Sequence, residues 1–494
     1  MDALVRVAWL LRTSRLAGSD DSTAAFAEAL ARCGCSVNLT ALSRFETGTA
    51  AVPERVIVGY ERVLHLPAGR LLGVSLGLHR MFGRALVPNR TRPRRETWSD
   101  LLGVLESRID DHTITGMDWL TLSQAICRPT GMLLPPSVLR SWTALLVSQA
   151  MRSVGTAYTT RMQALSLLIS DRQTRLATFE EVERATSRPG AQAVIDVLAT
   201  LGDTTDPLIL RWLIQRLEQD SGPHQVGVAK ALLTPVIQGT FPASLVPSLT
   251  QAILSAARAG GDRGLPAFWL AQRLSRPLTQ QVVVALGRYP NPVHAGYRIQ
   301  SPASLDAYIA AAFRASGLVD PMLERLLREA LSPDFIERRH HALLLLDSSP
   351  YGQVLADTAL DLLNDRSTST AAADAAATAL TYLARPAHRD RLVATLDSVP
   401  IGLKGTVLVA LAHSGGVPAT VDLLHHTADP EHAIDAVYAA GMSNHPDLQT
   451  MVTSSALADT PVRSAATWWC RTGPAIADRS MTVADQAAQG RQSA

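Results

Sequence analysis

The sequence predicts an all-α protein in which a short N-terminal helical domain precedes an α-solenoid, a stack of helix pairs. Three observations lead to this prediction. Apolar residues near the N-terminus recur three and four positions apart, as on one face of a helix. From Trp98 to about residue 475 no segment alternates polar and apolar residues as a strand does. Breakers such as Gly260-Gly261 divide that long region into short helical stretches.

Length and composition limit the class of protein. A chain of 494 residues is too long for one compact core and predicts several domains or a repeat array. Its apolar runs are far shorter than a membrane span, and we expect no leader segment and no membrane partner. Four cysteines are too few for disulfide bonds to stabilise a chain of this size. These features predict a cytoplasmic protein.

Charge is unevenly distributed along the chain. Residues 1–95 contain 14 arginines and 7 acidic residues, a net charge of +7, whereas the remainder carries −5. Only two of the 46 basic residues are lysines, Lys230 and Lys404. The basic N-terminal region is where we expect a polyanion to bind.

Five short helices are expected in the first 83 residues. Apolar spacing predicts the first over about residues 3–15, and the capping residues 20–22 precede the second. A turn at Cys33–Cys35 leads to the third. Pro53 suits the first position of the fourth, and Pro67 restarts the chain in a fifth helix towards Phe82.

The third helix is predicted to have two different faces. Asn38 is placed to cap its start, and Gly48 to let the chain turn away after it. Apolar residues three apart form the stripe expected to anchor it: Leu39, Leu42 and Phe45. Thr40 and Arg44 project from the opposite side. A helix that reads a DNA major groove needs this division, although any amphipathic surface helix shares it.

The motifs around this helix resemble those of a known family. Leu42-Ser43-Arg44-Phe45-Glu46-Thr47-Gly48 is followed by Pro53 and then by Tyr60-Glu61-Arg62-Val63-Leu64. This block is similar to the lambda-repressor-like (XRE) helix-turn-helix family, in the form common in high-GC bacteria. The resemblance covers about the first fifth of the chain. The turn between the second and third helices is longer than usual in that family.

The resemblance implies that the third helix enters the major groove of double-stranded DNA. Arg44 would then pair bidentately with guanine, and Glu46 would end the helix in a structural role. The residues expected to contact DNA from this helix and the loop after it are Asn38, Thr40, Ala41, Ser43, Arg44 and Thr49. The family's usual two half-sites imply a homodimer.

A basic segment follows the fifth helix. Arg90, Arg92, Arg94 and Arg95 cluster around Pro93, in a range, 84–97, that we expect to be a linker. Such a segment is typical of a tether that follows a phosphate backbone or a minor groove. An ordinary solvated tether has the same composition.

The remaining chain is expected to form a junction domain and a repeat array. The later breakers recur about every 30–35 residues per helix pair, the spacing of degenerate HEAT-type repeats. The expected domains are 1–83 (helix-turn-helix), 84–97 (linker), 98–155 (helical junction), 156–476 (HEAT-like α-solenoid) and 477–494 (disordered tail). The irregular stretch 288–298 is either a binding loop or a packing loop.

Catalytic and metal-binding patterns are weak. Gly73-Val-Ser75-Leu-Gly77 matches a hydrolase nucleophile motif, but it lies in a helical run instead of after a strand. The adjacent histidines at 340–341 and 425–426 diverge by about 100° on a helix and cannot share a metal ion. We expect no cofactor, no metal site and no enzymatic activity.

The first hypothesis is therefore a sequence-specific DNA-binding transcription regulator, associated with the nucleoid. Its solenoid would bind an effector: a peptide, a protein or a small molecule. Two alternatives remain open. A protein-interaction scaffold would show no DNA affinity at low salt, and a HEAT-like DNA-repair enzyme would produce abasic sites in damaged duplex.

Overall fold

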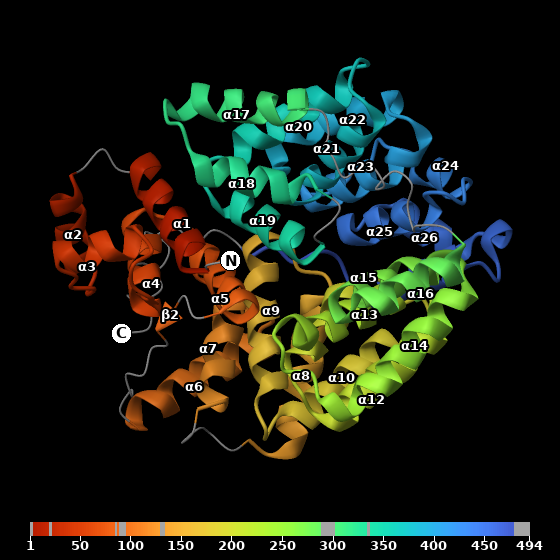
Figure 1. Ribbon diagram of the computed structural model, residues 1–494, viewed down its shortest axis with the longest axis horizontal. Helices are drawn as coiled ribbons and strands as arrows, with labels where there is room; N and C mark the ends of the chain where they lie inside the picture. Colours follow the sequence, from red (N-terminus) through yellow and green to blue (C-terminus); the bar gives the residue numbers. More distant parts are fainter. Residues whose placement is uncertain are drawn as a thin grey trace.

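The computed structural model describes residues 3–18, 22–83, 86–87, 95–128, 134–287, 302–332 and 336–478. Within these residues the chain folds into helices α1–α27, and two strands of two residues each form the only sheet (Figure 1). The prediction of an all-α fold is confirmed. No helix in the described ranges is long and apolar enough to cross a membrane.

The first five helices, which we call the N-terminal bundle, lie close to the five predicted. They are α1 (Ala3–Gly18), α2 (Thr23–Arg32), α3 (Leu39–Glu46), α4 (Glu54–Val63) and α5 (Arg70–Phe82). Strand β1 (Val52–Pro53) pairs in parallel with β2 (Leu86–Val87). The prediction that Pro53 opens the fourth helix is wrong by one position. Pro53 is the N-cap residue of α4, because its extended backbone belongs to β1.

The next eleven helices form what we call the first row. Most of them pack against the second helix along the chain, as in α7–α9, α11–α13 and α13–α15, or α8–α10, α12–α14 and α14–α16. They are α6 (Arg95–Asp110), α7 (Gly116–Ile126), α8 (Pro136–Ala150), α9 (Gly155–Ser170), α10 (Arg175–Thr186), α11 (Val194–Ala199), α12 (Pro207–Gln219), α13 (Gly222–Ile237), α14 (Val246–Ala259), α15 (Gly264–Leu274) and α16 (Arg276–Leu286).

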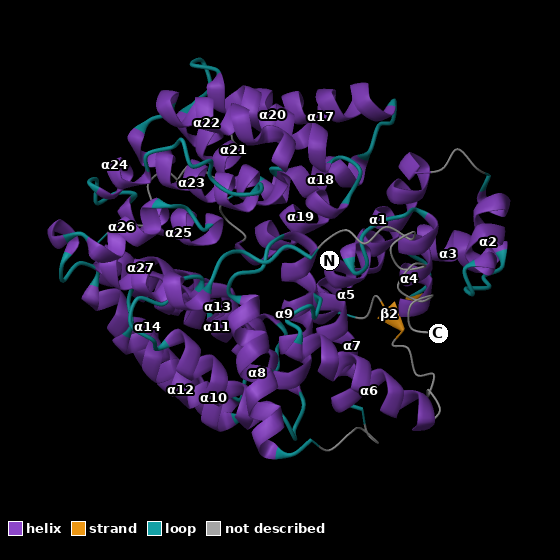
Figure 2. Cartoon of the chain, turned by 180° about the vertical axis from the view of Figure 1, so that it is seen from behind, coloured by secondary structure: helices purple, strands orange, loops and turns teal. Residues whose placement is uncertain are grey.

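The last eleven helices form the second row, which repeats this packing in α19–α21, α21–α23, α23–α25 and α25–α27. They are α17 (Pro302–Ser316), α18 (Pro321–Ala330), α19 (Ile336–Ser348), α20 (Gly352–Asn364), α21 (Thr370–Leu383), α22 (Arg389–Ser398), α23 (Ile401–His413), α24 (Leu423–Thr427), α25 (Ala433–Ser443), α26 (Asp447–Thr453) and α27 (Pro461–Thr472). The two rows lie one above the other in both ribbon views (Figures 1 and 2).

Helix boundaries fall where the sequence places its breakers. Gly260-Gly261 separates α14 from α15, and His445-Pro446 separates α25 from α26. Ser349-Pro350, Arg385-Pro386, 414–416 and Asp429-Pro430 also fall between α-helices, whereas Pro207 and Gly222-Pro223 lie in the first turns of α12 and α13. Since proline and glycine cost the most in a helix interior, these positions are the most reliable part of the helix prediction.

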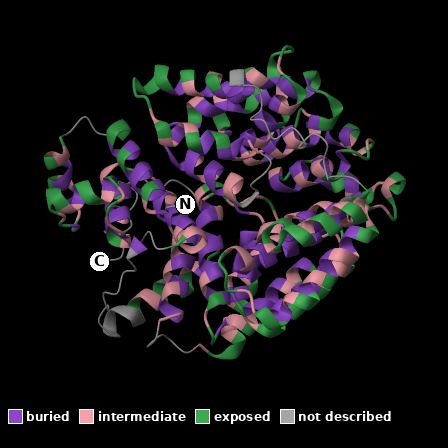
Figure 3. Cartoon of the chain, viewed as in Figure 1, coloured by how far each residue is buried: buried purple, intermediate pink, exposed green. Residues whose placement is uncertain are grey.

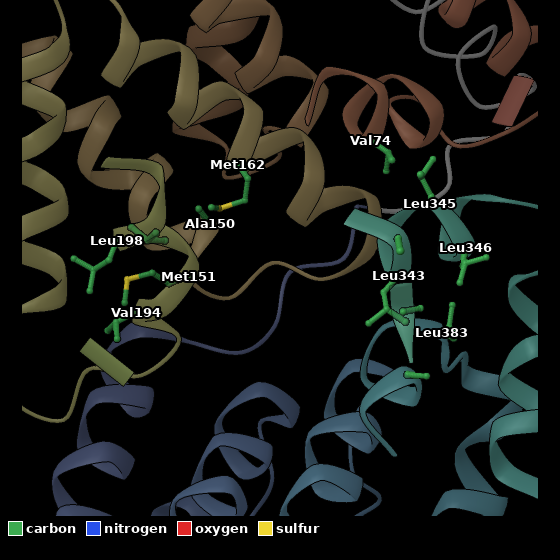
Figure 4. Close-up of a cluster of buried hydrophobic side chains, with 14 of the residues drawn as sticks. Val74, Ala150, Met151, Met162, Val194, Leu198, Leu343, Leu345, Leu346 and Leu383 are labelled. Atoms are coloured by element: carbon green, nitrogen blue, oxygen red, sulfur yellow. The ribbon is translucent and has the colours of Figure 1, made fainter. Parts of the chain in front are cut away.

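Helix α5 joins the N-terminal bundle to both rows. It contacts α1 and α4 in the bundle, α9 in the first row and α19 in the second. Gly73 and Gly77 let α9 approach closely, since a Cβ at these positions would lie 2.8 Å from Oγ1 of Thr159 and 3.3 Å from Nε2 of Gln163. On the side facing α19, Val74 lies near Leu345 (Figure 4). The glycine pattern that resembles a nucleophile motif thus serves helix packing.

Polar contacts reinforce this junction. Arg6 of α1 pairs with Glu329 of α18 at 2.5 Å, and both side chains are buried. Trp9 Nε1 donates to Asp320 at 2.7 Å. From α5, Arg70 Nη2 donates to the carbonyl of Asp347 at 3.1 Å. The bundle is therefore fixed to the rows by α1 and α5, whereas α2 and α3 lie at its outer edge (Figure 1).

The end of the second row returns to the start of the first. Ile476 pairs with Ser153 in an isolated β-bridge, in which the N–H of Val154 donates to the carbonyl of Ile476 at 3.0 Å. Asp478 lies in the segment predicted to be a disordered tail, yet it pairs with Arg161 at 2.9 Å. Residues 479–494 and the predicted loop 288–298 lie outside the described residues.

A glycine in the second row offers a test of this packing. Gly441 of α25 is so close to Trp469 of α27 that a Cβ would overlap the indole ring. We expect Gly441→Ala to lower the free energy of unfolding by about 1–3 kcal/mol, as overpacking does. Gly402→Ala in α23 is the matched control, because nothing lies within 4 Å of its added Cβ. Equal urea midpoints for the two variants would contradict this packing.

Candidate nucleic-acid interface

The ends of α3 are defined by local hydrogen bonds. The Oδ1 atom of Asn38 accepts the N–H of Ala41 at 2.7 Å, which confirms the predicted N-cap. After Glu46 the chain turns at Gly48, whose φ of 71° favours glycine. The Thr49 N–H then donates to the carbonyl of Arg44 at 3.0 Å. These bonds fix the register of the helix within the bundle.

The inner face of α3 carries fewer apolar anchors than predicted. Leu42 is fully buried and Phe45 is half-buried against the core. Leu39 does not belong to this face, since half of its surface is exposed. Asn38 and Thr40 beside it are exposed too, so the first turn of α3 extends past the covering helices. The prediction of a three-residue apolar anchor is wrong at Leu39.

A buried ionic cluster holds the C-terminal end of α3. Arg15 of α1 donates to both carboxylate oxygens of Glu46, from Nε to Oε1 and from Nη2 to Oε2, at 2.7 Å each. The hydroxyl of Tyr60 from α4 donates to Oε1 at 2.6 Å. Burial, together with Glu46, raises the pKa of Tyr60 far above its usual range. Glu46 thus ties α3 to both α1 and α4, consistent with the structural role expected for it.

The outer face of α3 presents small polar side chains and one arginine. Thr40, Ser43 and Arg44 are exposed, and Ala41 is half-exposed between them. The outer edge of the N-terminal bundle, at the left of Figure 3, carries green segments of exposed residues. Asn38 and Thr49 are exposed at the two ends of the helix. The structure therefore brings all six predicted residues of this region to one end of the bundle.

Two of these side chains already have local partners. Oδ1 of Asn38 is used by the cap, which leaves its amide hydrogens to donate outward. The hydroxyl of Thr49 donates to the carbonyl of Arg44 at 3.3 Å, so it would have to give up that bond to donate to a phosphate. Of the two, Asn38 is better prepared to bind an anion.

The predicted basic linker is only partly described. Arg90, Arg92 and Arg94 lie outside the described residues. Arg95 is the first residue of α6, so helix begins inside the range expected to be linker. Contact of this segment with a phosphate backbone or a minor groove stays a prediction.

Among the described residues, no metal site is found near α3. The described residues contain no group of three histidine, cysteine or acidic side chains close enough to hold a metal ion. Cys33 and Cys35, in the turn before α3, are both free thiols. Burial raises the pKa of Cys35, while Arg55 and Arg62 act against that shift. These two arginines are exposed, and they extend the basic character of this end of the bundle.

The sequence analysis did not identify the partners of Glu46. Arg15 lies four residues after Leu11, so the spacing of the apolar face of α1 brings it to the core side. The sequence names Tyr60 only as part of the block 60–64 that resembles the helix-turn-helix family. Two features together indicate such a pair: an acidic residue at the end of one helix, and an arginine on the core face of another.

Comparison of the chain with protein-family models, with curated proteins and with solved structures found no match.

Replacing Glu46 tests the role of the buried cluster. Glu46→Ala leaves Arg15 buried without its partner, and we expect the free energy of unfolding to fall by about 3–5 kcal/mol. Glu28→Ala removes an exposed carboxylate from α2 and should change stability by less than about 0.5 kcal/mol. Urea unfolding of both variants measures the difference. A Glu46→Ala variant as stable as the Glu28→Ala variant would contradict a structural role for the cluster.

Proposed function

We propose that the chain is a sequence-specific, double-stranded DNA-binding transcription regulator of the lambda-repressor-like (XRE) type, with α2 and α3 as its helix-turn-helix. The single observation that carries this proposal is the division of α3. Its outer face shows Thr40, Ser43 and Arg44, and its far end is fixed from behind by Glu46. A recognition helix needs an inner face that is held rigidly and an outer face of small, polar side chains.

In this proposal the front of α3 reads base edges. Arg44 pairs bidentately with guanine, a contact that contributes about 1–3 kcal/mol of discrimination. Thr40 and Ser43 reach base edges or phosphates, and Ala41 contacts a thymine methyl group. The amide of Asn38 and the backbone N–H groups at the start of α3 hold a phosphate.

The two rows would act as the sensing or partner-binding part of the regulator. Short helices that pack against their second neighbours support a HEAT-like α-solenoid for each row. Such arrays present long surfaces that bind peptides, proteins or small molecules. Two copies of the chain would bind two half-sites as a homodimer.

The first experiment identifies the operator and then tests Arg44. Genome-wide mapping of bound sites yields a bound sequence, and affinities for that sequence and for random duplex give the discrimination. We expect Arg44→Ala to reduce this discrimination by about 10- to 100-fold, because one bidentate pairing with a base is removed. Arg62→Ala removes an equally exposed arginine from α4 and should leave the ratio unchanged. Unaltered discrimination in Arg44→Ala would overturn the assignment of α3.

The basic segment after α5 has a separate test. Replacing Arg90, Arg92, Arg94 and Arg95 by alanine should weaken binding to all duplexes alike, because phosphates carry no sequence information. The slope of log affinity against log salt should become shallower by about 0.9 for each phosphate that the protein no longer neutralises. An unchanged slope would show that this segment does not touch DNA.

A further inference from the structure

Facing helices of the two rows bring together a set of polar and aromatic side chains outside the N-terminal bundle. The first row contributes one residue each from α9, α11 and α13, and the second row one each from α19, α21, α23 and α25. We call this set the interior seam: Tyr158, Asp196, Lys230, His340, Tyr382, His413 and Tyr438.

The charged pair of the interior seam belongs to the first row. Nζ of Lys230 donates to Oδ1 of Asp196 at 3.2 Å. Burial acts to raise the pKa of Asp196, but Lys230, and then His340 and Tyr158, outweigh it and lower the pKa to about 2. Asp196 is therefore ionised at neutral pH, and its charge is balanced by Lys230.

The second row supplies neutral groups that both donate and accept hydrogen bonds. Nδ1 of His340 is 3.0 Å from the hydroxyl of Tyr382. Burial, with Lys230 and Arg80 nearby, lowers the pKa of His340 to about 4. Nδ1 of His413 lies 2.8 Å from the carbonyl of Thr381, so this nitrogen carries the proton. Nε2 of His413 then accepts from Tyr438, 2.7 Å away.

These side chains are both enclosed and accessible. Asp196 keeps 38% and Lys230 24% of its side-chain surface exposed, and the other five are only partly buried. Yet burial is the largest cause of the raised pKa values of Tyr158, Tyr382 and Tyr438. Side chains on an open outer face would be solvated too well to shift in this way. Solvent therefore reaches these seven side chains, although much of the surrounding space is filled by protein.

We propose that the interior seam binds an uncharged, planar aromatic molecule that carries both hydrogen-bond donors and acceptors. Among the seven residues of the interior seam, the charge of Asp196 is balanced by that of Lys230, so the seam itself offers no net charge to a ligand. Neutral histidine and tyrosine side chains can donate or accept as the ligand requires. Their rings also offer faces and edges for aromatic contacts. A nucleoside and a phenolic amide share this chemistry.

The interior seam lies close to the helix that joins the bundle to the rows. Arg80, near the end of α5, pairs with Asp203 at 3.0 Å, and its charge acts on both Tyr158 and His340. A bound ligand would thus lie beside α5. The role of this ligand as an effector of DNA binding rests on the proposed function. Binding of the ligand to the interior seam is measured in the absence of DNA.

The two lysines of the chain make a direct experiment possible. Reductive methylation with ¹³C-formaldehyde labels Lys230 in the interior seam, Lys404 in α23 and the N-terminal amine, and each lysine dimethylammonium keeps its charge and one N–H. Lys230→Arg and Lys404→Arg each remove one NMR signal and so assign the two lysines. We expect adenosine or 4-hydroxybenzamide to shift the Lys230 signal saturably and to leave Lys404 unchanged. Binding of adenosine would indicate a nucleoside ligand, and binding of 4-hydroxybenzamide would indicate a phenolic one.

Charged counterparts and hydroxyl deletions complete the test. Adenosine 5′-monophosphate and 4-hydroxybenzoate should bind at least tenfold more weakly than their neutral partners. Tyr382→Phe and Tyr438→Phe keep the rings, and at least one should weaken binding by about three- to tenfold, the loss of one neutral hydrogen bond. Circular dichroism checks that each variant is folded.

Three results would overturn the proposal. The first is that neither neutral probe shifts Lys230, or that Lys230 resists methylation in the folded chain but not in urea. The second is that the anions bind as tightly as the neutral probes. The third is that both folded tyrosine variants bind like the unaltered chain. DNA affinity is measured separately on the unmethylated chain, so a failure of the proposed function is seen independently.

Discussion

The close packing of α5 against both helical rows is the constraint on which the arrangement of the molecule depends. Gly73 and Gly77 remove the side chains that would hold α9 away, and Val74 continues the core towards α19. Helix α1 adds the buried pair between Arg6 and Glu329. Because α1 and α5 both pack against the rows, the bundle shares its core with the rows and has a fixed orientation relative to them.

Because α1 and α5 pack against the rows, α3 lies on the opposite side of the bundle, where its two faces have different surroundings. Behind it, Glu46 accepts three hydrogen bonds from Arg15 and Tyr60 in a buried setting. In front, Thr40, Ser43 and Arg44 are exposed. The proposed DNA-binding role requires this contrast. A side chain that contacts bases must be exposed, and the helix backbone that carries it must be held in place.

Local patterns in the sequence predicted much of the fold. Asn38 caps α3 and Gly48 ends it, because capping and positive φ depend on neighbouring residues alone. Leu39 was misassigned because periodicity gives the face of a helix but not how far the covering helices extend. Pairs such as Arg6 and Glu329 are 323 residues apart, and no local pattern indicates them. The interior seam was missed for the same reason, since each helix contributes one member at an irregular interval.

The bridge between Ser153 and Ile476 has a consequence for how the chain is made. Helices that pack on near neighbours can form as they leave the ribosome, since their contacts have low sequence separation. The bridge, and the pair between Arg161 and Asp478, need a segment that is synthesised more than 300 residues later. Until then, the surfaces of α8 and α9 that receive it stay uncovered. We therefore expect closure of the two rows to be a late event in folding, which waits for the segment that follows α27.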